Sequence, residues 1–346
     1  MKKIISVLLL IALSLTLIVS CDKLSLSALG DKANSKDETV IKIGYMQGPT
    51  GMGMAKLIHD NGGIEGNEKY SFTKFEDVQA ATAALLSGAI DFACLPTNNA
   101  SIVYNTKNEA VKVLAINCLN SLFVLTKSGT EVSSFKELDN KTIYTISNGT
   151  PKVILDYLLE ANGITAEVKT EVEINGETKQ LAQPSDLASA IIAGAVDIAL
   201  VPEPVATAAP LQVVSQKKDY TYSTAFSIDD AWAEASDTPV AMGCIVARAE
   251  FVENHKSLVD SFLGEYKNSV DFISNKENID TAAEYIVEAS VLGAVPAAKK
   301  SLLNLGTSIA YIDGKEMKTT LVAFYNSIGS GLIGGKLPDD GFYYEK

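Results

Sequence analysis

Four short segments hold the side chains of this sequence that are best suited to binding a small molecule. They are rich in glycine, which lets a ligand approach the backbone closely, and in hydroxyl and amide groups, which form hydrogen bonds. The candidate binding residues are Gln47, Gly48, Thr50 and Gly51, then Thr97, Asn98 and Asn99, then Ser147, Asn148, Gly149 and Thr150, and finally Glu203. Any one of them is equally consistent with an ordinary cap or turn, but the set as a whole favours a binding site.

Glu203 is the one charged residue of these segments. Its carboxylate would accept a hydrogen bond either from an amine or ring N–H of the ligand, or from nearby backbone amides. Because no basic residue accompanies it, a sulfonate or nitrate would be held by amides and hydroxyls alone. A neutral or cationic heterocycle is an equally open alternative.

Two of the segments follow an expected strand and lead into an expected helix. The strand at 40–45 runs through the glycine-rich turn at 47–51 into a helix containing Leu57 and Ile58, which Asn61-Gly62 ends. The strand at 142–146 runs through 147–151 into a second helix. There Thr150 is the expected N-cap and Pro151 the first helical residue, and Asn162-Gly163 ends the helix.

The other two segments end a duplicated pattern. Residues 84–96 read ALLSGAIDFACLP and residues 190–202 read AIIAGAVDIALVP. Each predicts a helix end, a glycine break and a short strand that runs into a proline. Asp91 and Asp197 start the two strands and are expected to be structural, accepting backbone amides. The chain therefore contains two similar α/β units.

The order of these units predicts a discontinuous arrangement. We expect one lobe from residues 39–120 plus 243–346 and the other from 121–242, with two crossing strands near 120–126 and 239–246 as the hinge. The helices after Phe251 should pack on the first lobe. In such open α/β sheets, ligands bind beyond the carboxyl ends of the strands, so all four segments should face one interlobe cleft.

Composition excludes several classes of function. The 346 residues are 47% hydrophobic and 21% charged, which is a globular composition, and the net charge of −13 argues against nucleic-acid binding. With one arginine, Arg248, and two histidines, His59 and His255, we expect no metal site and no cofactor. Three cysteines lie far apart in apolar stretches and are expected to be buried free thiols: Cys94, Cys118 and Cys244.

The N-terminus predicts export. Lys2 and Lys3 precede an apolar run of signal-peptide length, so residues 1–20 are expected to be a signal peptide. The run ends in Ile-Val-Ser-Cys21, which resembles the lipobox of bacterial lipoproteins and implies lipidation at Cys21. Residues 21–38 are polar and would form a flexible linker. A transmembrane anchor, or a cleaved signal with an incidental cysteine, is the alternative.

Taken together, the chain resembles the substrate-binding lipoproteins of ABC transporters, in the branch that includes sulfonate, taurine, nitrate and thiamine-precursor binding proteins. The resemblance rests on the lipobox, on Gly48-Pro49-Thr50, on the paired Gly-Ala-x-Asp motifs, and on the segments 147–151, 202–204 and 336–344. It implies the two-lobed α/β fold of type II periplasmic binding proteins. It also implies a monomer, held outside the cytoplasm by its lipid, that delivers a small molecule to a membrane permease.

Two other functions remain open at this stage. A ligand-sensing lipoprotein coupled to a receptor would have the same sequence features. Enzymes of menaquinone or thiamine biosynthesis share the fold but are cytosolic, and the four segments contain no activated nucleophile or partnered base, so we expect no catalysis. Trp232 and Tyr222 would either stack on a planar ligand or pack in the core.

Overall fold

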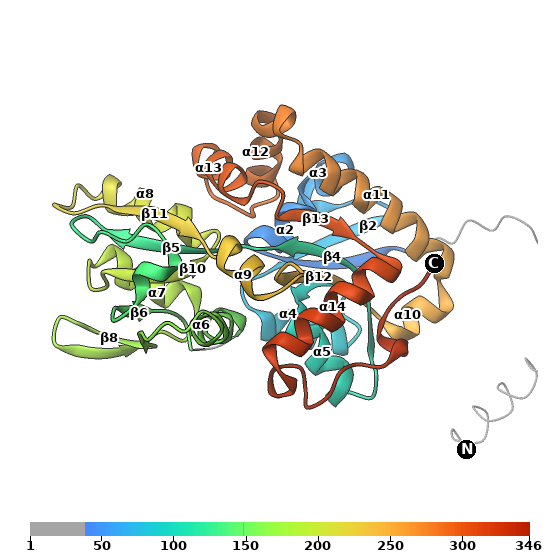
Figure 1. The fold of residues 1–346 in the computed structure, drawn as a ribbon. Helices are drawn as coiled ribbons and strands as arrows, with labels where there is room; N and C mark the ends of the chain where they lie inside the picture. The colour runs from blue at the N-terminus through green and yellow to red at the C-terminus, as the bar shows by residue number, and fades with distance from the viewer. Residues whose placement is uncertain (1–38, 148) are drawn as a thin grey trace, which may run out of the picture. The chain divides into compact units, whose positions relative to one another are not determined.

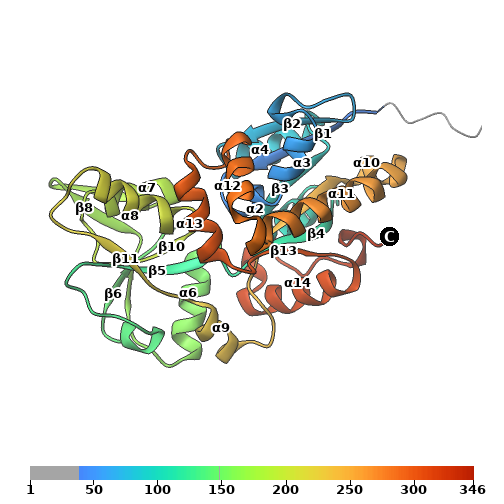
Figure 2. The same ribbon diagram turned by 90° about the horizontal axis from the view of Figure 1, so that it is seen from above.

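The computed structural model describes residues 39–147 and 149–346. The predicted signal peptide (1–20), the lipidation site Cys21, the linker (21–38) and the candidate binding residue Asn148 lie outside the described residues. Residues Thr39–Lys346 form one compact unit, which contains two large sheets, each covered by helices, and a small two-stranded one (Figures 1 and 2). The hairpin sheet belongs with the second large sheet. We call each large sheet with its helices a lobe.

The first lobe has a six-stranded sheet in the order β13-β4-β12-β3-β1-β2. Its strands are β1 (Ile41–Met46), β2 (Tyr70–Phe75), β3 (Phe92–Pro96), β4 (Val111–Leu119), β12 (Ala241–Arg248) and β13 (Ile309–Ile312). Its helices from the first part of the chain are α2 (Pro49–Met52), α3 (Ala55–Asp60), α4 (Val78–Leu86) and α5 (Thr97–Thr106). Those after β12 are α10 (Ala249–Asn254), α11 (Lys256–Ser274), α12 (Ile279–Glu288), α13 (Val295–Leu305) and α14 (Gly314–Ile328).

The second lobe has a five-stranded sheet in the order β11-β5-β10-β6-β7. Its strands are β5 (Leu122–Lys127), β6 (Thr142–Tyr144), β7 (Glu167–Lys169), β10 (Ile198–Pro202) and β11 (Tyr222–Ser227), and a hairpin of β8 (Glu171–Ile174) and β9 (Glu177–Gln180) stands beside them. The helices are α6 (Thr150–Ala161), α7 (Pro184–Ile192), α8 (Val205–Ser215) and α9 (Asp229–Ala235). Short 3-10 turns occur at Gly63–Glu65, Phe135–Leu138, Lys276–Asn278, Ser330–Leu332 and Asp340–Phe342.

The two sheets repeat one topology. In the first, β3 lies between parallel β1 and antiparallel β12; in the second, β10 lies between parallel β6 and antiparallel β5. The duplicated segments form α4–β3 and α7–β10. The predicted two-lobed α/β fold is therefore confirmed, and the motif shared by the units explains why their sheets match.

The chain crosses between the lobes at two adjacent points. The Asn120 amide donates to the carbonyl of Val240 at 3.0 Å, and the Val240 amide donates to Asn120 Oδ1 at 2.9 Å. Just inside the first lobe, Leu119 and Ala241 are paired. The two crossing segments thus lie side by side, as expected of a hinge. The lobe limits, 39–120 plus 243–346 and 121–242, stay our prediction.

Local structure differs from the sequence expectations at two helix starts. Gly149, with φ 88°, is the N-cap of α6, so Thr150 is the first helical residue and not the cap. The helix expected after residue 51 is divided into α2 and α3. A Cβ at Gly51 would lie 1.9 Å from the Met46 carbonyl oxygen, so only glycine fits where the chain turns back so tightly on β1.

The later helices do more than cover the first lobe. As expected, α10, α11 and α12 pack on it, but α13 also contacts α8 and α14 contacts α6 in the second lobe. Figure 2 shows α13 lying between α12 and α8. In the part of the chain that the structure describes, no helix combines the length and apolarity needed to cross a bilayer.

Trp232 and Tyr222 belong to the core. Trp232 is 2% exposed, packs against Tyr157 and Phe324 with ring centroids 5.2 and 5.9 Å away, and donates its indole N–H to the Thr238 carbonyl. Tyr222 is also buried and donates to the carbonyl of Val196. Of the two uses left open by the sequence, core packing is the one observed.

Candidate functional site

The four candidate segments follow neighbouring strands in each sheet. Segments 47–52 and 96–99 follow β1 and β3, and segments 147–151 and 202–204 follow β6 and β10. Within each lobe these strands are parallel neighbours, so their carboxyl ends lie at one edge of the sheet. The topology therefore brings the segments together in pairs.

Contact between the lobes occurs where two of these segments meet. A Cβ at Gly48 would lie 3.2 Å from Pro204 Cδ and 3.5 Å from the Glu203 carbonyl oxygen. Gly48 has φ 90° and ψ −167°, a conformation that glycine adopts readily. Glycine at this position therefore lets the 47–52 turn of the first lobe approach the 202–204 turn of the second.

Thr97, Asn98 and Asn99 lie in the first turn of α5 and not in a loop. The Thr97 hydroxyl is fully buried and donates to the Ala241 carbonyl at the start of β12. Asn99 Oδ1 accepts from the Thr82 hydroxyl at 3.1 Å. Asn98 is 8% exposed, and its side-chain amide has no hydrogen-bond partner among the described residues. Of the three, Asn98 retains the most capacity to bind a ligand.

The 47–52 turn offers one further free hydroxyl. The Thr50 carbonyl accepts from Asn117 Nδ2 at 3.2 Å, whereas its half-buried side chain makes no hydrogen bond within the described ranges. The Gly51 amide donates a hydrogen bond to the Gly48 carbonyl at 3.0 Å. Gln47 is exposed.

In the second lobe, Ser147 and Gly149 are exposed and Thr150 is 5% exposed at the start of α6. The Ser147 amide is bonded to the Leu181 carbonyl at 2.8 Å. The hydroxyls of Ser147 and Thr150 have no partner in the described part of the chain. Each lobe therefore contributes uncharged groups that can still form hydrogen bonds, among them Thr50 and Asn98 in the first and Ser147 and Thr150 in the second.

Glu203 is 3% exposed and differs from the other candidates. Its Oε1 accepts hydrogen bonds from Thr207 Oγ1 and from Asn304 Nδ2, both at 2.8 Å. Its Oε2 is buried without a partner among the described residues. Burial raises the pKa of Glu203, whereas the hydrogen bonds from Asn304 and Thr207, together with the nearby Ser301 hydroxyl, lower it by less.

Sequence reasoning missed the residues that hold Glu203. Thr207 lies one helical turn after it and was detectable from the spacing of four residues. Asn304 and Ser301 belong to α13, about a hundred positions later in the chain, and no motif marks them.

The remaining titratable groups do not gather at these segments. Cys94, Cys118 and Cys244 are free and buried, and burial raises the pKa of Cys94 and of Cys118 to about 12. His59 lies in α3 and its Nδ1 is 2.8 Å from Glu288 Oε2. Within residues 39–147 and 149–346, no three His, Cys, Asp or Glu side chains are grouped so that they could hold a metal ion.

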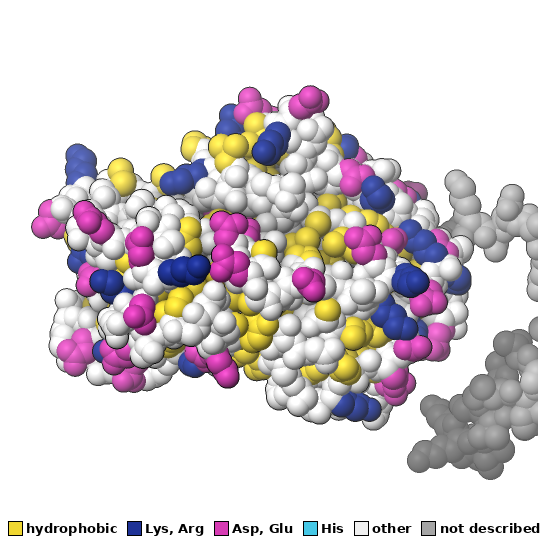
Figure 3. Space-filling view, viewed as in Figure 1, with side chains coloured by type: hydrophobic (Ala, Val, Ile, Leu, Met, Phe, Trp, Pro, Cys, Tyr) yellow, Lys and Arg dark blue, Asp and Glu magenta, His cyan; other side chains and the backbone are white. Residues whose placement is uncertain are grey.

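Charge is dispersed over the surface. On the face shown in Figure 3, acidic and basic side chains are interspersed, and the basic ones form no large patch. The arrangement therefore favours neither nucleic acid nor a polyanion on that face.

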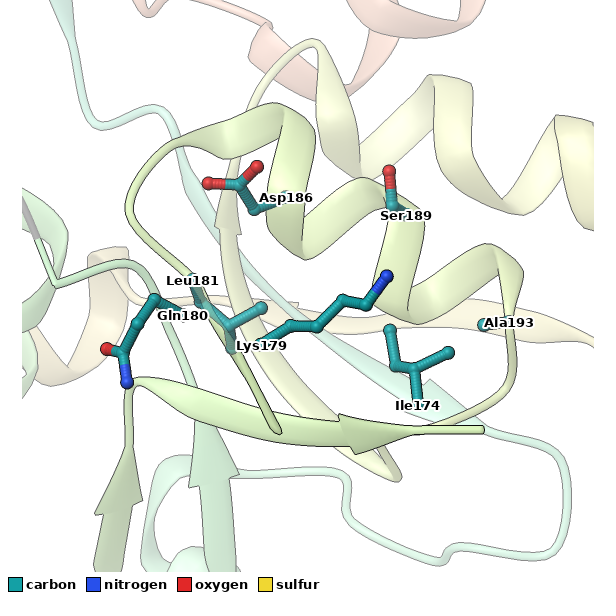
Figure 4. Close-up of a pocket in the computed structure, with 7 residues that line it drawn as sticks. All are labelled: Ile174, Lys179, Gln180, Leu181, Asp186, Ser189 and Ala193. Carbon is teal, nitrogen blue, oxygen red and sulfur yellow. The ribbon is translucent and has the colours of Figure 1, made fainter. Parts of the chain in front are cut away.

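A pocket of about 320 Å³ lies elsewhere, between the β8–β9 hairpin and α7. Figure 4 shows the Lys179 side chain extending between the hairpin and the helix, and Asp186 at the start of α7. Asp186 Oδ2 accepts hydrogen bonds from the backbone amides of Ala182 and Gln183, at 3.0 and 2.9 Å. None of the candidate residues lines this pocket.

Comparisons with known proteins agree with this architecture. Residues 71–278 match the model of a family described as NMT1/THI5 like. No match was found among curated proteins.

Several solved structures share the fold. An ABC transporter from Parabacteroides distasonis is 20% identical, with a TM-score of 0.68 over 89% of this chain and 99% of the other. The ligand-binding component of an ABC-type import system from Staphylococcus aureus is 17% identical, with a TM-score of 0.65 over 88% and 96%. The periplasmic aliphatic sulphonate binding protein of Escherichia coli is 15% identical, with a TM-score of 0.60 over 83% and 92%. At these identities the likeness establishes the fold.

Proposed function

The chain belongs to the NMT1/THI5-like family, and on that premise we propose that it is an extracytoplasmic solute-binding protein. It captures a small molecule between its two lobes, releases it unchanged, and delivers it to an ABC permease. The signal peptide directs its export, and a lipid on Cys21 tethers the mature protein to the membrane.

The observation that carries this proposal is the paired arrangement of free groups. Thr50 and Asn98 of one lobe and Ser147 and Thr150 of the other lie at the carboxyl edges of two matched sheets, and their side chains have no hydrogen-bond partner among residues 39–147 and 149–346. A ligand that bonds to both pairs does so fully only when the lobes are together. Ligand binding then favours the closed arrangement by the difference in affinity between the two states.

The ligand class follows from the charges at the site. The segments present uncharged donors and acceptors and one buried carboxylate, Glu203. A sulfonate, taurine or nitrate would be held by hydroxyls and amides, whereas an amino-heterocycle resembling a thiamine precursor would also donate to Glu203. The neighbour from Escherichia coli is described as binding aliphatic sulphonates, which keeps the first option in the test.

Thermal-shift screening separates these classes. The panel is alkanesulfonates, taurine, nitrate, aminopyrimidine thiamine precursors and flavin-like heterocycles, tested on the wild type and on Glu203→Gln. A ligand that donates an N–H to Glu203 should lose affinity in the variant, while an oxyanion should bind equally or better. If Glu203→Gln changes the thermal shift of every ligand equally, the variant affects the arrangement of the lobes. If it changes the shift of some ligands and not of others, Glu203 takes part in ligand recognition. If no compound stabilises the wild type, this ligand class is rejected.

Affinity measurements then test the individual groups. Thr50→Val and Thr150→Val should each weaken the best ligand by about 0.5–1.5 kcal/mol, the usual net value of a neutral hydrogen bond. Thr319→Val is a matched control, because its exposed hydroxyl in α14 bonds only to the Lys315 carbonyl. Mass spectrometry of the same ligand after incubation should show no conversion, and turnover would favour an enzyme instead.

Membrane attachment has its own test. Cys21→Ala should release the protein from membranes and leave its circular dichroism spectrum unchanged. Continued attachment of this variant to membranes would contradict lipidation at Cys21.

A further inference from the structure

The two lobes touch along two flanks of opposite chemistry. On one flank, α14 of the first lobe packs against α6 and α9 of the second, and one continuous core includes Leu158, Trp232, Leu321 and Phe324. On the other, α13 of the first lobe meets α8 of the second. The hydrogen bonds across this flank join polar side chains, and the buried apolar residues of α13 and α8 belong to separate clusters.

The polar flank contains a small closed network. Asn304 Nδ2 donates to Glu203 Oε1 at 2.8 Å and lies 3.0 Å from Thr207 Oγ1, which also donates to Glu203. Two buried atoms of this flank have no partner among the described residues, Glu203 Oε2 and the hydroxyl of Ser301. The network thus bonds the lobes together but leaves two polar groups without hydrogen bonds.

Separating the flanks has very different consequences. Parting α14 from α6 and α9 would expose apolar surface to water, and the free-energy cost rises in proportion to the area exposed. Parting α13 from α8 would break the Asn304–Glu203 bond but would let water bond to Glu203 Oε2 and Ser301, whose burial without partners is unfavourable. The polar flank is therefore the one that opens more easily.

We propose that Glu203, Thr207 and Asn304 form an interlobe latch, and that the lobes part at this latch while α14 stays packed on α6 and α9. The inference rests on the proposed function only in taking separation of the lobes as the event that admits a ligand. The latch itself acts in the ligand-free protein.

Its position next to the crossing segments couples loss of the latch to a larger movement elsewhere in the lobes. The Glu203 amide donates to the Ser121 carbonyl at 3.0 Å, and the Ser308 hydroxyl donates to the Asn120 carbonyl at 2.9 Å. A 2.8 Å hydrogen bond is lost when its atoms separate by less than about 1 Å. A rotation that moves residues near the hinge by this amount moves the far ends of the lobes much further.

Distance measurements between spin labels in ligand-free protein test the latch. The three described native cysteines are buried, so labels can be directed to cysteines introduced at the exposed positions Lys218 in the second lobe and Lys276 in the first. Asn304→Ala should raise the open-to-closed ratio about tenfold, as expected for losing one hydrogen bond to a charged group. Asn254→Ala is the matched control, since its exposed amide bonds only within α10, to the Glu250 carbonyl.

Two further measurements fix the mechanism. Glu203→Gln keeps Oε1 as an acceptor and places an amide near Ser301, so it should not raise the open population. Labels across the apolar flank, at Asp156 and Thr319, should keep one distance in every variant. An unchanged Lys218–Lys276 distance in Asn304→Ala, or an equal change across the apolar flank, would overturn the proposal.

If Asn304→Ala does not fold, Asn304→Asp keeps the size of the side chain but replaces the amide that donates to Glu203 with a carboxylate that repels it, and the same outcomes apply. Opening in Asn304→Ala with no ligand found in the screen would reject the proposed ligand classes and keep the latch. Ligand binding with no effect of Asn304→Ala would do the reverse.

Discussion

The two α/β units of this protein have the same backbone at corresponding points but different surroundings. Gly48 caps α2 with φ 90° and ψ −167°, and Gly149 caps α6 with φ 88° and ψ −168°. Both helices follow a strand of equivalent position in its sheet. The repeated sequence pattern therefore specifies the turn geometry of both units closely.

Side chains at matched positions have nonetheless diverged. Asp91 is buried, accepts from the Lys42 amide at 3.1 Å and pairs with Arg248 at 2.9 Å. Its counterpart Asp197 is 72% exposed and lies 4.0 Å from Lys127. After the shared proline, the first unit has Thr97, bonded to Ala241, and the second has Glu203, bonded to Asn304. A shared motif thus fixes the turn, while neighbouring elements decide what its side chains do.

The strongest test of this difference compares the two aspartates. Asp91→Ala leaves Arg248 without its buried partner and should lower the free energy of unfolding by about 3 kcal/mol. Asp197→Ala removes an exposed, weak pair and should change it by less than about 0.5 kcal/mol. Urea denaturation measures both. Equal losses would mean that the two positions are equivalent after all.

The two capping glycines test the similarity. Alanine is strained in this backbone conformation, so Gly149→Ala should lower the free energy of unfolding by about 1–3 kcal/mol. Gly48→Ala should lower the free energy of unfolding by more than Gly149→Ala does. The added Cβ at Gly48 would also lie 3.2 Å from Pro204 Cδ of the other lobe, whereas a Cβ at Gly149 would have no neighbour nearer than 3.7 Å. Gly264→Ala, inside α11 with open space around it, is the control and should be neutral or stabilising.

A smaller effect distinguishes how the lobes treat buried carboxylates. In the second lobe, burial raises the pKa of Asp229 from 3.8 to about 6, and its Oδ1 has no partner among the described residues. The folded state therefore binds the proton of the Asp229 carboxyl group more tightly than the unfolded state does. Protonation of Asp229 stabilises the fold fully below about pH 4, and this stabilisation is lost as the pH rises through about 6.

Asp229→Asn should consequently raise the free energy of unfolding by about 1 kcal/mol at pH 7.5 and by little at pH 4. The change is smaller than the full pKa shift implies, because solvent screens the charge of a partly exposed group. Thermal denaturation at the two pH values measures this. Asp237→Asn, at an exposed position of the same lobe, is the control. An equal effect of Asp229→Asn at both pH values would contradict the linkage.

Local repeats and turn residues made the fold predictable, because the signals for the strand, turn and helix of each unit lie within a few residues of one another. Because hydroxyl side chains are common caps, the sequence predicts Thr150 as the N-cap of α6. The N-cap is instead Gly149, since the backbone at that position has a positive φ of 88° that favours glycine. The Asp91–Arg248 and Glu203–Asn304 contacts join residues 157 and 101 positions apart. No local pattern encodes such pairs, although the presence of a single arginine in the sequence was a hint of its structural use.

The place of β12 in the first sheet has a consequence for how the protein is made. This strand lies between β3 and β4, yet it is synthesised after every strand of the second lobe. Until residues 241–248 leave the ribosome, β3 and β4 lack the neighbour that joins them. The second lobe, whose sheet is complete by Ser227, is free to fold first. Completion of the first sheet therefore requires strands spread over residues 41–312, whereas the second sheet needs only residues 122–227.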